Sequence, residues 1–121
     1  MILDLIRINS LQVKIQPEIV NSEKKMSVIV VAEFPMTKQG AQDFIEWSKS
    51  DDGYVITRQH KGFKDIRTFL AEDKKKVYLY EKWESKEDHQ AYLNFRVKDG
   101  LMDFLNPRLD GDFKVTYFSE E

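Results

Sequence analysis

Residues 77–93, VYLYEKWESKEDHQAYL, constrain the fold more than any other stretch of this chain. Val77 to Trp83 is rich in β-branched and aromatic residues, which pack well on a pleated surface and predict a strand. Ser85 follows and lies three positions before Asp88, a spacing at which a hydroxyl and a first-turn carboxylate can both cap a helix. The sequence therefore predicts a helix over residues 86–97, and a pocket is expected where the strand and the helix meet.

Strands and helices alternate along the rest of the chain from Met26 onward. Residues 27–34, SVIVVAEF, are nearly all apolar or β-branched, as expected of a central strand buried on both faces. Thr37 can cap a second helix, which would have an apolar side. That side carries Ala41, Phe44, Ile45 and Ser48. Alternating patterns bounded by turn residues predict three further strands, at residues 63–71, 76–83 and 113–118.

The predicted order is strand, helix, strand, strand, helix, strand, which is the ferredoxin-like βαββαβ arrangement of the α+β class. In this arrangement the helices cover one face of a four-stranded antiparallel sheet. On the strand at residues 76–83, Val77, Leu79 and Trp83 point one way. Tyr78 and Tyr80 point the other way, so the uncovered face is also apolar. No third layer remains in the chain to cover it, and we expect a homodimer that packs sheet against sheet.

Residues 1–25 lie outside this pattern and form an N-terminal extension to a domain at residues 26–121. Leu11, Val13 and Ile15 alternate with polar neighbours, which is typical of a strand, and Pro17 would place that strand at a sheet edge. The extension is then either a poorly ordered leader or an extra strand that extends the sheet or crosses to the partner chain. The alternation favours the strand. The extension lacks the basic front and the cleavage site of a signal peptide.

Composition excludes several classes of function. A chain of 121 residues suits one domain with a single core, and its net charge of −2 gives no reason to expect nucleic acid or an anionic membrane as a partner. No apolar run is long enough to span a membrane. The absence of cysteine excludes disulfides, thiolate catalysis and cysteine-ligated metals, and His60 and His89 lie on different elements. We therefore expect a cytoplasmic protein without a metal site.

Three segments carry a family resemblance over about three-quarters of the chain. They are VIVVAEFPMTKQGAQDF at residues 28–44, the turn at residues 61–63, and YEKWESKE at residues 80–87, which matches an E-x-W-x-S-x-E pattern. With these segments the chain resembles the antibiotic biosynthesis monooxygenase domain family, whose members are dimeric α/β barrels of ferredoxin-like subunits. The resemblance implies a cavity between the helices and the sheet, beside Trp83.

The resemblance also implies a chemistry. Some family members oxygenate phenols, quinols or polycyclic aromatics without a metal or a flavin, because the deprotonated substrate gives an electron directly to dioxygen. Such a reaction needs a flat apolar cavity, hydrogen-bond donors for an oxyanion, and a base that titrates near neutral pH. On this basis no cofactor is expected, and the substrate would be a small aromatic or quinol-like molecule.

Five residues are candidates for this site. His89 is the candidate base or donor and Trp83 its catalytic neighbour, while Phe44 and Tyr92 would form the walls. Glu33 interrupts an apolar strand, so it is a candidate cavity acid, although a salt bridge to Lys or Arg explains it better. Packing alone also explains Trp83, Phe44 and Tyr92. His89 lies in the first turn of its helix, where the dipole disfavours the imidazolium, and a half-exposed inert histidine fits that position too.

Two other functions stay open besides the monooxygenase. One is an isomerase that uses the same cavity, and the other is a non-catalytic small-molecule-binding or stress-related dimer. Haem chemistry is not expected. Haem-degrading relatives use a histidine farther along the helix and an asparagine on the first strand. The matching positions here are around Leu93 and Asn94, where there is no histidine, and close to Glu33.

Overall fold

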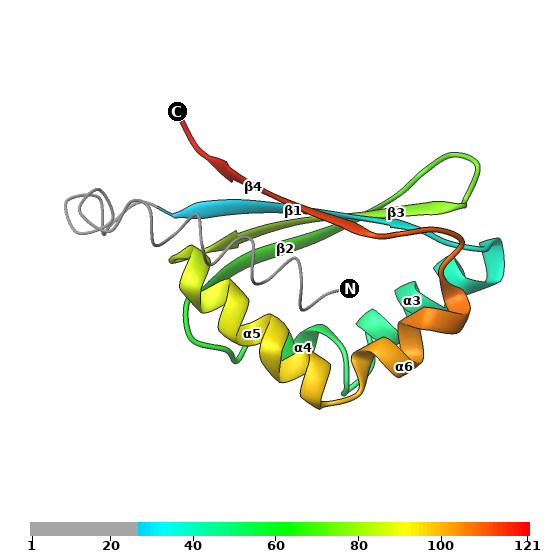
Figure 1. Cartoon of the computed structure of the whole chain (residues 1–121), viewed down its shortest axis with the longest axis horizontal. Helices are drawn as coiled ribbons and strands as arrows, with labels where there is room; N and C mark the ends of the chain where they lie inside the picture. The colour runs from blue at the N-terminus through cyan, green and yellow to red at the C-terminus, as the bar shows by residue number, and fades with distance from the viewer. Residues whose placement is uncertain (1–26) are drawn as a thin grey trace.

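The computed structural model describes residues 27–121, which form one sheet with helices on one side (Figure 1). The elements are β1 Val28–Pro35, α3 Lys38–Ser48, α4 Tyr54–Thr57, β2 Phe63–Leu70, β3 Lys76–Trp83, α5 Lys86–Lys98, α6 Leu101–Leu105, the 3-10 helix η1 Asn106–Arg108, and β4 Lys114–Ser119. The predicted order is confirmed. The strand expected within residues 1–25 lies outside the described residues. None of the described helices has the length and apolar character that crossing a membrane requires.

The four strands form an antiparallel sheet in the order β2-β3-β1-β4, as the ferredoxin-like arrangement predicts. The register brings one row of side chains together across all four strands. Glu81 on β3 lies opposite Ile66 on β2 and opposite Val30 on β1, and Val30 in turn lies opposite Tyr117 on β4. Because side chains directly opposite each other share a face, this row lies under the helices.

The two faces of the sheet differ as the alternation predicts. On β3 the inward residues Val77, Leu79, Glu81 and Trp83 are all buried, whereas Tyr78, Tyr80 and Lys82 on the other face are half-buried. The inward face packs against an aromatic cluster in which the Phe44 ring lies between the rings of Phe34, 5.7 Å away, and Trp47, 5.4 Å away. The main core therefore sits between the sheet and the helices.

Both predicted helix caps are present. The Thr37 hydroxyl accepts a hydrogen bond of 2.9 Å from the Gly40 backbone N–H, and the Ser85 hydroxyl accepts one of 3.1 Å from the Asp88 N–H. Each cap satisfies a helix N–H group that has no partner within its own helix. The cap residue Ser85 lies only two residues after β3 ends, so α5 turns back across the sheet (Figure 1).

Gly40 allows η1 to approach the start of α3 closely. A Cβ built on Gly40 would lie 2.5 Å from the backbone oxygen of Arg108, which also accepts a hydrogen bond from the Thr37 N–H. A side chain at this position would push η1 away from the helix start.

We predict that Gly40→Ala destabilises the fold although alanine favours helices. Propensity alone would stabilise the helix by about 1 kcal/mol, whereas the clash with the Arg108 carbonyl is expected to lower the free energy of unfolding by about 1–3 kcal/mol. Urea denaturation of the two proteins measures the difference, with Gln42→Ala on the exposed side of α3 as the control. A more stable Gly40→Ala protein would show that η1 does not press on α3.

Candidate functional site

A carboxyl group lies in the core beneath α5. Glu81 is only 4% exposed, and it occupies the inward position on β3 between Leu79 and Trp83. The strand alternation forces this placement, because the residues two positions before and after it are core residues. A buried carboxyl group is costly unless it has hydrogen-bond partners, so those partners define the site.

Two ring nitrogens approach the same carboxyl oxygen of Glu81. The Trp83 indole N–H donates a hydrogen bond of 2.8 Å to Oε1, and Nε2 of His89 lies 3.7 Å from Oε1. The other ring nitrogen of His89, Nδ1, is hydrogen-bonded at 2.8 Å to the hydroxyl of Tyr117 on β4. The first turn of α5 thus places an imidazole between a carboxyl group on β3 and a phenol on β4.

Burial changes the charge of both titratable groups. It raises the pKa of Glu81 from 4.5 to about 7, although the hydrogen bond from Trp83 opposes the shift. It lowers the pKa of His89, which is only 1% exposed, to about 3. Between these two values the pair holds one proton, and above about pH 7 the pair becomes anionic. A carboxyl group of this kind exchanges its proton near neutral pH, as a general acid or base must.

A second hydrogen-bond network holds the helices that cover the site. The Arg96 side chain of α5 donates to the hydroxyl of Tyr92 at 2.7 Å and to the backbone oxygen of Gly53 at 2.8 Å. The Tyr92 hydroxyl also pairs with the hydroxyl of Thr57 on α4 at 2.7 Å. Burial raises the pKa of Tyr92, and Arg96 opposes that shift. The buried guanidinium therefore fastens α4 and the preceding turn to α5.

A small cavity lies between these helices and the sheet. Its volume is about 50 Å³, and its lining includes Phe44, Tyr54, Ile66, Leu79, Glu81, His89 and Tyr92. That volume holds a water molecule or a diatomic gas, since one water needs a volume of roughly 10–15 Å³. It is well below the volume of about 300 Å³ at the lower end of drug-sized ligand sites. An aromatic substrate enters only if a wall side chain moves.

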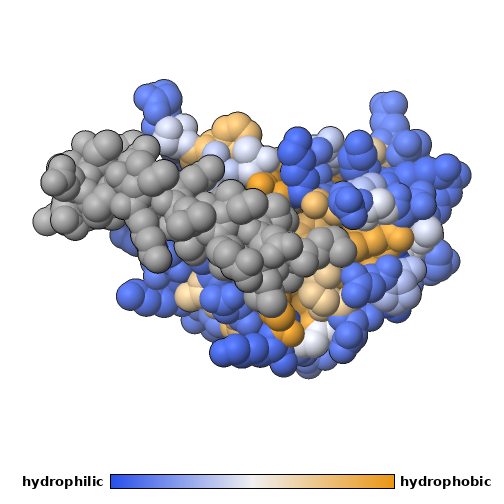
Figure 2. Space-filling model, in the orientation of Figure 1, coloured by the Kyte–Doolittle hydropathy of each residue, from blue (hydrophilic) through white to orange (hydrophobic). Residues whose placement is uncertain are grey.

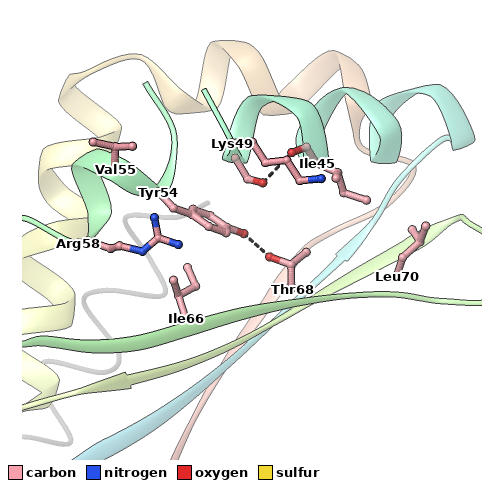
Figure 3. A pocket seen from close by; sticks show the side chains of 9 residues that line it. Ile45, Lys49, Tyr54, Val55, Arg58, Ile66, Thr68 and Leu70 are labelled. Carbon is pink, nitrogen blue, oxygen red and sulfur yellow. Dashed lines mark hydrogen bonds between the residues drawn. The ribbon is translucent and has the colours of Figure 1, made fainter. Parts of the chain in front are cut away.

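A larger groove of about 560 Å³ lies directly outside this cavity, on the surface between α3, α4 and β2 (Figure 3). Tyr54 and Ile66 line both spaces and form the wall between them. The Tyr54 hydroxyl is hydrogen-bonded at 2.7 Å to the hydroxyl of Thr68, which holds the ring in place. Burial raises the pKa of Tyr54, so this phenol stays protonated.

The structure brings four of the five candidate residues together. Phe44, His89 and Tyr92 line the cavity, and the Trp83 ring lies beneath it, with its centroid 5.2 Å from that of Tyr92 and 5.5 Å from that of His89. His89 is buried rather than half-exposed, because α5 lies flat on the sheet and β4 supplies a hydroxyl for its ring.

The structure does not support Glu33 as a cavity acid. The inward positions of β1 are Val30, Ala32 and Phe34, so Glu33 projects from the opposite face of the sheet and does not line the cavity. Its cross-strand neighbour Lys114 on β4 lies on that outer face as well. The interpretation as a surface carboxylate fits this position better than that of a cavity acid.

Sequence reasoning missed Glu81 and Tyr117. The signal for Glu81 was present, because counting every second residue from Val77 places it on the same face as Leu79 and Trp83. Tyr117 had no such signal, since its role depends on β4 lying beside β1 under the start of α5. Within residues 27–121, no group of three or more acidic or histidine side chains is placed to hold a metal ion.

Comparison with known proteins adds a family and a fold. A family model described as antibiotic biosynthesis monooxygenase matches residues 27–96. None of the curated proteins matches the sequence. A similar solved structure is a monooxygenase from the gene ActVA-Orf6 of Streptomyces coelicolor, in complex with the ligand nanaomycin D. It is 18% identical, with a TM-score of 0.68 over 83% of this chain and 92% of that one.

Two further structures share the fold. Rv0793 from Mycobacterium tuberculosis is 20% identical, with a TM-score of 0.59 over 78% of this chain and 95% of its own. A dimeric ferredoxin-like protein from an uncultured marine organism is 11% identical, with a TM-score of 0.63 over 81% of this chain and 90% of its own. At these identities the likeness shows the fold alone.

The raised pKa of Glu81 predicts how stability changes with pH. In the unfolded chain Glu81 loses its proton near pH 4.5, whereas in the folded protein it keeps the proton until about pH 7. Over that window the folded state binds the proton more tightly, so the Glu81 contribution to stability falls as the pH rises.

We therefore expect Glu81→Gln, which mimics the protonated side chain, to gain stability relative to the wild type as the pH rises from 4.5 to about 7. The gain should reach about 3 kcal/mol in the free energy of unfolding. His89 is present in both proteins, so its own titration cancels in the difference. Chemical denaturation at several pH values provides the measurement, and a difference that stays constant with pH would contradict the placement of Glu81.

Proposed function

The chain belongs to the antibiotic biosynthesis monooxygenase family, and on this premise we propose that it is a cofactor-independent monooxygenase for a small aromatic or quinol-like substrate. The reaction would take place between the helices and the sheet, at Glu81. A monooxygenase with the same fold carries nanaomycin D as a ligand, which supports a ligand-binding role for this fold.

The buried carboxyl group of Glu81 is the observation that carries the proposal. A base that removes a proton from a weakly acidic substrate works best when its pKa lies close to the working pH. Glu81 meets this condition because burial raises its pKa to about 7. It also lines an apolar cavity, where the charge that develops on the substrate is not screened by water.

The proposed reaction balances with dioxygen as the only co-substrate. The Glu81 carboxylate takes a proton from a CH₂ group between aromatic rings, and the resulting carbanion gives one electron to dioxygen. The two radicals combine to form a C–O bond, and Glu81 returns its proton to the distal oxygen. Loss of the second C–H proton then breaks the O–O bond, so that one oxygen atom becomes the carbonyl and the other leaves as water.

The neighbours of Glu81 have supporting roles in this scheme. The Trp83 indole N–H holds the carboxyl group in one orientation through its hydrogen bond of 2.8 Å. His89 stays neutral near pH 7 and lines the cavity, so it can hydrogen-bond an oxyanion or a peroxide there. The Tyr117 hydroxyl fixes the orientation of the imidazole ring.

The size of the cavity favours a second candidate function. With a volume of about 50 Å³ the cavity accepts dioxygen but not an aromatic ring unless Tyr54 or another wall residue moves. A dimer that binds a small molecule without catalysis needs no such movement if its ligand stays in the outer groove. The two functions differ in whether dioxygen is consumed.

The uncovered face of the sheet supports a homodimer, which we propose as the working assembly. Phe69 on β2 is 54% exposed and Phe118 on β4 is 49% exposed, and both lie on the outer face with Tyr78 and Tyr80. An apolar face of this extent is costly in water, and a second sheet packed against it would remove the cost. The dimeric ferredoxin-like protein of the same fold supports this assembly.

We expect light scattering at micromolar concentration to give a mass of about twice the 14.3 kDa of one chain. A double substitution, Phe69→Glu with Phe118→Glu, should halve that mass, because four carboxylates would then face each other between the sheets. Phe95→Glu, which changes an exposed phenylalanine on the helical side, is the control and should leave the dimer intact. A monomeric wild type would remove this part of the proposal.

Oxygen uptake with a panel of quinols and anthrones tests the catalytic proposal. We expect Glu81→Gln to lower kcat by about 10²- to 10⁴-fold, the usual contribution of a general base. The wild-type kcat should rise with pH around a midpoint near 7, as Glu81 loses its proton. Trp83→Phe should shift that midpoint upward, because the hydrogen bond that favours the carboxylate is lost.

Glu33→Gln is the matched control for this assay, since it makes the same chemical change on the outer face of the sheet. It should consume oxygen at the wild-type rate. Equal uptake by Glu81→Gln and the wild type would remove Glu81 as the base. Absence of uptake across the panel, together with saturable binding of the same compounds, would favour the non-catalytic dimer.

A further inference from the structure

The groove outside the cavity has the size of a ligand site. It lies between the end of α3, the short helix α4 and the inner face of the edge strand β2, and its volume is about 560 Å³ (Figure 3). Small-molecule sites usually have volumes of about 300–1,000 Å³. A ligand that is too large for the small cavity therefore has room in the groove.

The walls of the groove are aliphatic and partly open to water. They come from three elements, with Ile45 on α3, Val55 on α4, and Ile66 and Leu70 on β2. Val55 is 43% exposed and Leu70 is 42% exposed, and both are among the most exposed large apolar side chains of the described part of the chain. An apolar ligand that covers them would be stabilised by the area it removes from water.

Two cations line the same groove. Lys49 follows the end of α3 and Arg58 follows the end of α4. Neither makes an ion pair with a side chain in residues 27–121, and none of the described residues that line the groove is acidic. The whole chain carries a net charge of −2, so this local excess of positive charge does not follow from the composition. This positive charge favours the binding of an anion in the groove.

We propose that this groove binds a small aromatic carboxylate, with the carboxylate attracted by the positive charges of Lys49 and Arg58, which lie on opposite sides of Tyr54, and the ring against the aliphatic walls (Figure 3). An inorganic anion would leave the walls exposed, and a neutral hydrocarbon would leave both cations without a partner. A planar ring with one acidic group matches both features at once.

The orientation of the ring toward Glu81 rests on the proposed function, whereas binding in the groove does not. Tyr54 and Ile66 separate the groove from the cavity, so a ligand in the groove touches the wall beyond which Glu81 lies. The carboxylate end would be repelled by Glu81 and would lose its hydration in the apolar cavity. The ring end of the ligand therefore faces the cavity. The substrates proposed for the site are then aromatic acids.

Calorimetric titration of the full chain with 2-naphthoate tests the inference. The neutral ketone 2-acetonaphthone, which has nearly the same shape, is the ligand control. We expect Lys49→Gln and Arg58→Gln each to weaken naphthoate binding by about threefold, and the double variant to weaken it by about tenfold, as for partly exposed ion pairs. Lys98→Gln removes an exposed cation outside the groove and should bind as the wild type does.

Higher salt should weaken the binding of naphthoate but not that of the ketone. In methyl NMR spectra the naphthoate should shift the signals of Val55 and Leu70, which line the groove. Equal affinity of the wild type and the double variant, equal affinity for acid and ketone, or no saturation at millimolar concentration would each overturn the inference. Naphthoate binding together with no oxygen uptake on the quinol and anthrone panel would contradict the proposed function alone. Oxygen uptake on that panel without naphthoate binding would contradict the groove proposal alone.

Discussion

The hydrogen bond from the Trp83 indole to the Glu81 carboxyl group is the interaction on which the site depends. Alternation along β3 forces Glu81 into the core, and desolvation of a carboxyl group without partners would oppose folding. The indole N–H satisfies one carboxyl oxygen, and His89 approaches the same oxygen from α5. The partners are sufficient to keep the group buried but leave its pKa near 7, and this combination makes a core residue available for proton transfer.

The helices around this carboxyl group are held by a different kind of contact. Arg96 lies in the core with its guanidinium on backbone carbonyls before α4 and on the Tyr92 hydroxyl of α5. Tyr54, on the wall toward the outer groove, is buried as well, with its hydroxyl hydrogen-bonded to Thr68 and its ring packed against the ring of Trp47. Arg96 thus supports both sides of the cavity, because it holds α5 at Tyr92 and also holds α4, which carries Tyr54.

Local patterns in the sequence were enough to predict most of the fold. The caps at Thr37 and Ser85 and the alternation along β3 and β4 depend on residues within four positions of each other, so they can be recognised without knowing the tertiary structure. The candidate site was predicted less completely. Glu33 and Glu81 both interrupt apolar strands, and the choice between them required the face on which each one lies.

By itself the sequence determined the order of the elements, the two faces of each strand and the aromatic residues that gather near Trp83. Only the tertiary structure decided that the pKa of Glu81 is raised, that His89 is buried and neutral, and that the cavity is small and adjoins a basic groove. The physical reason is that a pKa and a cavity depend on which distant residues displace water. Tyr117 lies 28 residues from His89 in the chain, and no local pattern predicts that their side chains meet.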